Sequence, residues 1–120
     1  MTDLAPDSFR TVGSPDDLSE DGVVPYYVPD RRLRVAIARL DGRLYAFDDL
    51  CTCTSPRCPL SGGLLTGTTI TCQCHGSQYD VPTGAVISGP ATEALTIYEV
   101  RQVGETIRLR LRAAVVRGGQ

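Results

Sequence analysis

The sequence predicts an all-β fold, and three observations support this prediction. The 120-residue chain contains 12 Gly and 8 Pro, a share that favours many turns and short strands. No stretch long enough for a globular helix shows a clean helical period. Near the C-terminus, apolar residues alternate with Arg108, Arg110 and Arg112, which is typical of a half-buried strand with a cationic outer face.

The expected strands follow one another at short intervals, nine or ten in all. Asp41-Gly42 is the strongest hairpin signal, a two-residue type I′ turn. Pro25 makes its own segment an edge strand, since proline cannot donate to a ladder. The expected segments are 9–12, 23–28, 33–40, 43–47, a pair within 64–72 around Gly67, 77–81, 85–87, 94–103 and 106–112.

Length and charge indicate one domain without a nucleic-acid or membrane role. We expect the domain to span residues 9–112, with flexible termini at 1–8 and 113–120. A net charge of −2 lacks the basic excess of nucleic-acid binders, and no apolar run is long enough for a membrane span. The N-terminus lacks the basic and apolar regions of a secretory signal, so we expect a cytoplasmic protein.

All the cysteines and the only histidine fall between Leu50 and Asp80. They form two groups on loops rich in Gly, Pro, Ser and Thr: Cys51, Cys53 and Cys58, then Cys72, Cys74 and His75. Cysteines of a cytoplasmic protein are more often metal-binding or redox-active than structural. The pattern therefore predicts a metal or iron–sulfur site, a disulfide site, or both.

The second group, Cys72-Gln-Cys74-His75-Gly76-Ser77, resembles the Cys-x-x-His box of the Rieske [2Fe–2S] proteins. In that family, Cys-x-His on one loop and Cys-x-x-His on another hold the two irons. Further similarities are Pro59-Leu60-Ser61-x-Gly63, Tyr79-Asp80, Thr83-Gly84 and Gly89-Pro90-Ala91. The resemblance covers residues 9–111 and implies stacked antiparallel sheets with two cluster-binding loops.

The first box departs from the family pattern, because His75 is the only histidine. If Cys51-Thr-Cys53 is the box, 18 residues separate Cys53 from Cys72, two more than the family spacing. If Cys53-Thr-Ser55 is the box, with serine in place of histidine, 16 residues separate Ser55 from Cys72, as in the family. We favour the second register, in which Ser55 occupies the vacant ligand position.

The resemblance then implies a role for each side chain. Cys53, Cys72 and His75 are the expected iron ligands, with Ser55 as the tentative fourth ligand and Cys51 as the alternative to it. Cys58 and Cys74 occupy the positions of the disulfide found in some Rieske proteins. Ser77 and Tyr79 match hydroxyls that donate hydrogen bonds to cluster or ligand sulfur, which raises the reduction potential.

The function implied by the resemblance is one-electron transfer by a Rieske-type ferredoxin with an atypical ligand set. Its expected partners are redox proteins, a reductase and an oxygenase. With one histidine, the chain cannot also hold a His/carboxylate iron site, so we expect a carrier rather than a catalyst. The alternatives are a cluster-free binding module of the same fold and, less favoured, a zinc site of Cys51, Cys53, Cys72 and His75.

Overall fold

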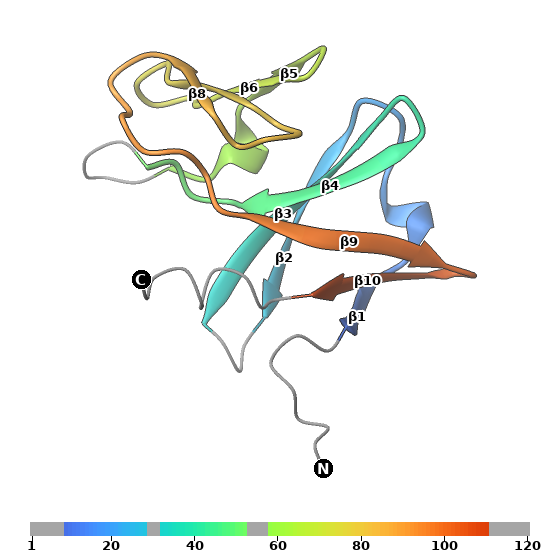
Figure 1. Ribbon diagram of the computed structural model, residues 1–120. Helices are drawn as coiled ribbons and strands as arrows, with labels where there is room; N and C mark the ends of the chain where they lie inside the picture. Colours follow the sequence, from blue (N-terminus) through green and yellow to red (C-terminus); the bar gives the residue numbers. More distant parts are fainter. Residues whose placement is uncertain (1–8, 29–31, 53–57, 111–120) are drawn as a thin grey trace.

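The computed structural model describes residues 9–28, 32–52 and 58–110, which form two antiparallel sheets (Figure 1). The strands of the larger sheet are β1 (Phe9–Gly13), β2 (Val23–Val28), β3 (Leu33–Leu40), β4 (Arg43–Asp48), β9 (Ile97–Val103) and β10 (Thr106–Arg110). Those of the smaller sheet are β5 (Leu64–Thr66), β6 (Thr69–Thr71), β7 (Gln78–Asp80) and β8 (Val86–Ser88). The predicted all-β fold is confirmed, while the predicted termini lie outside the described residues.

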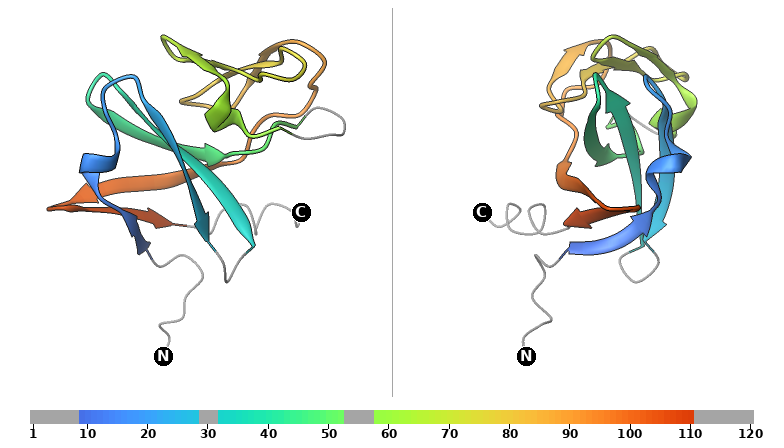
Figure 2. Two further views of the ribbon diagram at one scale, coloured as in Figure 1. Left: turned by 180° about the vertical axis from the view of Figure 1, so that it is seen from behind. Right: turned by 90° about the vertical axis from the view of Figure 1, so that its right-hand side faces the viewer.

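The larger sheet has the order β1-β10-β9-β4-β3-β2, and the smaller has the order β5-β6-β7-β8. Figure 2 shows the larger sheet strongly curled, with the smaller sheet lying at one end of it. Two 3₁₀ turns, η1 (Pro15–Asp17) and η3 (Leu60–Gly62), interrupt the connections. No helix in the described ranges has the length and apolar character needed to cross a bilayer.

Strand β3 connects the two halves of the core because it is buried on both faces. Val35 and Ile37 belong to the apolar core inside the curled sheet. Ala36 and Ala38 belong to a second, inter-sheet core, which also contains the buried cysteines. All four side chains have no exposed surface, so this strand reads as a continuous apolar run rather than an alternating one.

The turn between β3 and β4 confirms the hairpin prediction. Asp41 and Gly42 have φ angles of 56° and 79°, and a type I′ turn needs positive φ at both positions. The carboxylate of Glu20 accepts hydrogen bonds from both turn amides, at 3.2 Å from the Gly42 nitrogen. Glu20, in the acidic segment before β2, therefore stabilises this turn.

The last hairpin differs from the prediction at its start. A strand was expected from residue 94, but β9 begins at Ile97. Leu95 is buried in the inter-sheet core, and its N–H donates to the carbonyl of Gly84 at 2.8 Å. The carbonyl of Thr96 accepts the Asp48 N–H at 2.9 Å. These contacts pin residues 94–96 between the two sheets, where they cannot join the β9 ladder.

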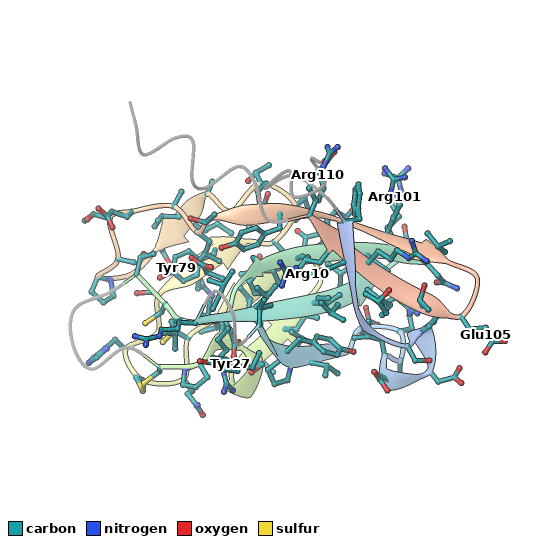
Figure 3. All side chains as sticks on the ribbon, turned by 90° about the horizontal axis from the view of Figure 1, so that it is seen from below. Arg10, Tyr27, Tyr79, Arg101, Glu105 and Arg110 are labelled. Atoms are coloured by element: carbon teal, nitrogen blue, oxygen red, sulfur yellow. A yellow bond between two sulfur atoms is a disulfide. The ribbon has the colours of Figure 1, made fainter. Side chains whose placement is uncertain are left out.

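The outer face of the same hairpin carries Arg110, one of the predicted arginines, and Arg101 of β9, which was not predicted. The guanidinium groups of Arg101 and Arg110 lie 4.2 and 4.9 Å from the centre of the Phe9 ring, and Arg110 also pairs with Glu99. Figure 3 shows Arg101 and Arg110 projecting from this side of the sheet. Ile107, on the opposite face, is fully buried, so the predicted alternation is confirmed within β10.

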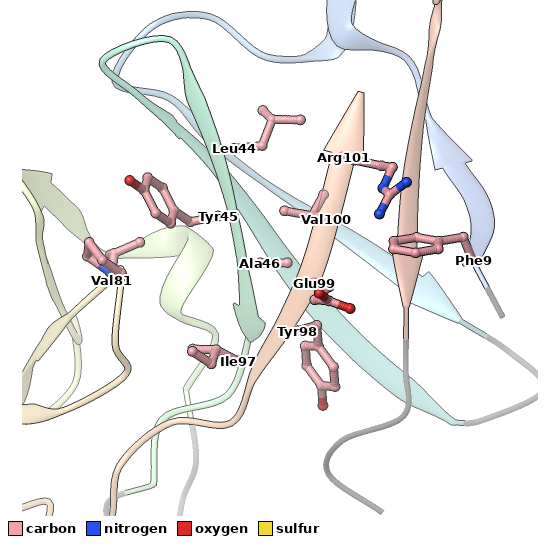
Figure 4. Close-up of a pocket in the computed structure, with 11 residues that line it drawn as sticks. Phe9, Leu44, Tyr45, Ala46, Val81, Ile97, Tyr98, Glu99, Val100 and Arg101 are labelled. Carbon is pink, nitrogen blue, oxygen red and sulfur yellow. The ribbon is translucent and has the colours of Figure 1, made fainter. Parts of the chain in front are cut away.

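Strands β4 and β9 pair at only two positions, Ala46↔Tyr98 and Phe47↔Ile97, and then separate. A cavity of about 240 Å³ opens beside this seam (Figure 4). Its lining consists of Phe9, Leu44, Tyr45, Ala46, Val81, Pro82, Ile97, Tyr98, Glu99, Val100 and Arg101. None of these side chains belongs to the cysteine loops, so the cavity is separate from the predicted metal site.

Candidate metal centre

A disulfide joins the two cysteine loops. Cys58 and Cys74 are bonded, with their Cα atoms 6.3 Å apart, although they are 16 positions apart in the chain. Cys58 is buried against the inter-sheet core, whereas Cys74 is exposed in the second loop. The disulfide implied by the resemblance is therefore present in the structure, and it holds the two loops next to each other.

The second loop is a tight turn between β6 and β7. The Cys72 N–H donates to the carbonyl of Ser77 at 2.8 Å, and the Gly76 N–H donates to the carbonyl of Cys72 at 3.0 Å. Gly76 has a φ of +79°, which favours glycine because it has no Cβ. This turn brings the predicted ligands Cys72 and His75 together, with Cys72 as a buried free thiol and His75 exposed.

The first loop is closed at its base by backbone pairing. Leu50 forms a bridge with Pro59, and the Cys51 N–H donates to the carbonyl of Cys58 at 3.1 Å. Cys51 is fully buried in the same core as Cys72, and its sulfur is disulfide-bonded. The predicted ligands Cys53 and Ser55 lie outside the described residues, so their placement remains a prediction.

Ser77 is buried and has a defined acceptor role. Its Oγ accepts the backbone N–H of Ala91 at 3.1 Å, so the hydroxyl proton remains available for donation to another group. Gly89 permits this close approach, because a Cβ at that position would lie 2.5 Å from the Ser77 Cα and its φ is +102°. The loop that ends in Ala91 therefore fixes the serine hydroxyl from one side.

Tyr79 projects from β7 toward the first loop and is fully buried. Its hydroxyl accepts the Thr52 N–H at 2.9 Å and lies 3.1 Å from the Thr52 Oγ1. Thr52 in turn donates its hydroxyl proton to the carbonyl of Glu93 at 2.6 Å. The phenol thus joins the smaller sheet to Thr52 of the first loop, the residue after Cys51.

Asp49, which the sequence analysis did not single out, is the fully buried carboxylate of the site region. Asp49 lies at the start of the first loop, and its carboxylate accepts hydrogen bonds from Arg34 of β3 and from Ser61 of η3, which follows the loop. An aspartate beside a polar loop is usually exposed, so the sequence contained no local signal for this burial. Thr52 was missed for the same reason, since threonine in a loop indicates no particular partner.

The described residues fit half of a [2Fe–2S] site. Cys72 supplies a free thiol and His75 an imidazole from one rigid turn, which are the donor types that such a site takes from its second loop. Within the described ranges, no three His, Cys, Asp or Glu side chains converge as a metal-ion site. The remaining donors have to come from the first loop, part of which those ranges do not include.

A curled sheet and a smaller one, with two cysteine loops cross-linked by a disulfide at one end, form the architecture expected for an iron–sulfur domain. A family profile for the Rieske [2Fe–2S] domain matches residues 8–99. The chain belongs to this family. The resemblance seen in the Cys72–Ser77 box is thereby confirmed, and a [2Fe–2S] cluster is the cofactor that membership implies.

Curated relatives match over most of their length. The naphthalene 1,2-dioxygenase system ferredoxin component of Pseudomonas aeruginosa is 30% identical over 99 residues, covering 76% of this chain and 93% of the relative. The same component of Pseudomonas putida is 35% identical over 85 residues, covering 71% and 78%. The chain is therefore similar in extent, as well as in sequence, to ferredoxin components of dioxygenase systems.

Solved structures agree with this assignment. A chain in the complex of reduced oxygenase and oxidized ferredoxin in carbazole 1,9a-dioxygenase has a TM-score of 0.74 and 27% identity, covering 85% of this chain and 92% of that one. Sphingomonas yanoikuyae B1 ferredoxin has a TM-score of 0.77 over 86% and 98% of the two chains. At 23% identity, the second likeness supports the fold alone.

The disulfide is expected to contribute measurably to stability. The double variant C58S/C74S should lower the free energy of unfolding by about 3 kcal/mol, because it releases a closed loop of roughly fifteen residues in the unfolded chain. Urea denaturation without reductant measures the difference. With reductant present, wild type and variant should coincide, and equal stability without reductant would contradict the cross-link.

Proposed function

We propose that this chain is a one-electron carrier, a Rieske-type ferredoxin that supplies electrons to an oxygenase system. The observation that carries the proposal is the Cys72–His75 turn, with a free buried thiol and an imidazole held beside the first loop by the disulfide. The similarity to dioxygenase ferredoxin components over most of both chains supports the same role. When bound, the cluster would accept and release one electron.

We propose Cys72 and His75 as the ligands from the second loop, and Cys53 and Ser55 as those from the first. Cys51 is the alternative to Ser55. Its burial beside Cys72 in the inter-sheet core supports the alternative, but its sulfur could bind iron only after its disulfide is reduced. A third thiolate in place of an imidazole would make the site more negative and lower its reduction potential.

Variants of the first loop distinguish the possible ligands. With Ser55 as ligand, C51A should keep the visible spectrum and the potential of wild type, whereas C53A should lose the cluster. S55H should restore a spectrum of the two-histidine type and raise the potential. Absorption and EPR spectra of proteins purified without oxygen measure these outcomes. Loss of the cluster in C51A, or an unchanged spectrum in S55H, would make Ser55 the wrong residue.

Ser77 and Tyr79 are proposed to raise the reduction potential through their hydroxyl protons, and for Tyr79 this requires its proton to turn from the Thr52 Oγ1, 3.1 Å away, toward a sulfur. The Ser77 Oγ already accepts the Ala91 N–H, so its own proton can stabilise added negative charge on a sulfur. S77A should therefore lower the midpoint potential by about 40 mV or more, the equivalent of one hydrogen bond. Protein-film voltammetry measures the shift, with S88A as a control on exposed β8. An unchanged potential in S77A would contradict the role.

The partners proposed are an oxygenase that receives the electron and a reductase that supplies it. The relatives are ferredoxin components of naphthalene dioxygenase systems, and a structural relative occurs in a complex with an oxygenase. This chain is expected to act with a system of that kind, as a carrier rather than as the catalyst. The particular oxygenase is to be found by testing candidate oxygenases for electron uptake from the reduced protein.

We also propose a cytoplasmic location and a single domain over residues 9–112. Iron ligation needs Cys72 as a thiolate, which a reducing compartment favours, whereas the Cys58–Cys74 disulfide has to persist there. The inter-sheet core, to which β3 and β4 of the larger sheet and β6 and β7 of the smaller sheet contribute buried side chains, supports a single unit. Cell fractionation and limited proteolysis test the two statements, and a periplasmic protein or a stable smaller fragment would contradict them.

Metal and sulfide analysis separates the proposal from its alternatives. We expect iron and acid-labile sulfide in equal amounts, with visible absorption bands, in protein purified or reconstituted without oxygen. A zinc site would give zinc without sulfide. A binding module without a cluster would retain neither metal nor sulfide after reconstitution, and either result would overturn the ferredoxin assignment.

A further inference from the structure

The carboxylate of Asp49 connects three parts of the chain around the base of the first cysteine loop. Oδ2 lies 2.5 Å from the Nε of Arg34 on β3 and 3.0 Å from the Oγ of Ser61. Oδ1 accepts the backbone N–H of Ser61 at 2.7 Å. The side chain has no exposed surface, so its charge is neutralised by protein groups alone.

These contacts join the start of the first loop to its end. Asp49 directly follows β4, whereas Ser61 lies in η3, which directly follows the loop. The carbonyl of Asp49 also accepts the Leu60 N–H, adjacent to the Leu50↔Pro59 bridge. These bonds therefore hold the two ends of the first loop together at its base.

Arg34 fixes this arrangement to the centre of the fold. The Asp49 N–H donates to the Arg34 carbonyl at 3.0 Å, so main chain and side chain both join the two residues. The Arg34 side chain is 42% exposed, while its partner is completely buried. Because a buried charge that loses its partner is strongly destabilising, the pair favours one placement of the loop base.

We propose that Asp49, supported by Arg34 and Ser61, is a positioning residue that holds together the two ends of the first loop, residues 50–52 and 58–61, next to the turn that carries Cys72 and His75. The inference rests on the proposed function, since it assigns a role within that site. Asp49 acts through the closed base of the loop and not as a ligand. Its charge and that of Arg34 also bias the reduction potential in opposite directions.

The first test is hydrogen exchange of the full-length chain, with or without iron. In D49N, the side chain has only one acceptor oxygen and no charge, so it cannot make all the bonds that the carboxylate makes to Arg34 and Ser61. The base of the loop should therefore open more often. The Cys51 and Leu60 amides should exchange roughly 100-fold faster or more, while the Ile37 amide in β3 stays unchanged. Equal exchange of the loop amides in D49N and wild type would overturn the proposal.

The matched control is D48N, which alters the neighbouring carboxylate. Asp48 accepts the Tyr98 hydroxyl of β9 at 2.6 Å, on the side of β4 away from Ser61, so D48N should leave the Cys51 and Leu60 amides near their wild-type rates. If D48N accelerated them as much as D49N, the effect would come from β4 as a whole and the specific role of Asp49 would be wrong.

The second test uses the reconstituted protein and the variants R34M and R34K. Midpoint potentials should shift upward in D49N, which removes a negative charge, and downward in R34M, which removes a positive one. R34K should restore the wild-type potential and loop exchange. Shifts of the same sign, or a failure of R34K to rescue, would overturn the positioning role. If wild type binds no iron, the proposed function fails, whereas the exchange experiment still decides the role of Asp49 at the loop base.

Discussion

The described ends of the first cysteine loop, residues 50–52 and 58–60, and the second loop, residues 72–77, belong to different connections, and the bond between Cys58 and Cys74 joins them. Backbone bonds close each locally, Cys51 to Cys58 at the base of the first loop, and Cys72 to Gly76 and Ser77 in the second. Local order fixes the shape of a loop but not its distance from another. The cross-link supplies that distance, and the β3 strand beneath both loops gives them a rigid base.

The polar groups around the loops are arranged so that most of their hydrogen-bonding capacity is already used. Ser77 accepts from Ala91, Tyr79 accepts from Thr52, and Asp49 accepts from Arg34 and Ser61. Satisfied groups of this kind reorganise little when charge changes nearby, which suits a site that gains and loses an electron. The proton of Ser77 is the part of this network that remains to respond to that charge, because the Tyr79 proton can already be donated to the Thr52 Oγ1.

Features determined by short stretches of sequence were predictable, whereas those that depend on distant residues were not. The Asp41-Gly42 turn and the Cys72–His75 box each lie within a few residues, and the structure has the predicted turn at the first and a loop closed by backbone bonds at the second. The burial of Asp49 depends on Arg34 and Ser61, 15 and 12 positions away. Likewise, β9 starts at Ile97 because Leu95 is held by Gly84, a contact that no local pattern indicates.

The most direct test of the account is a reductive titration of the reconstituted, full-length chain followed by EPR. The account predicts uptake of one electron per chain and an EPR signal from a reduced [2Fe–2S] cluster that is bound by nitrogen as well as sulfur, with nitrogen couplings that arise from His75. A chain that takes up no electron would contradict the account, as would a reduced cluster without nitrogen coupling.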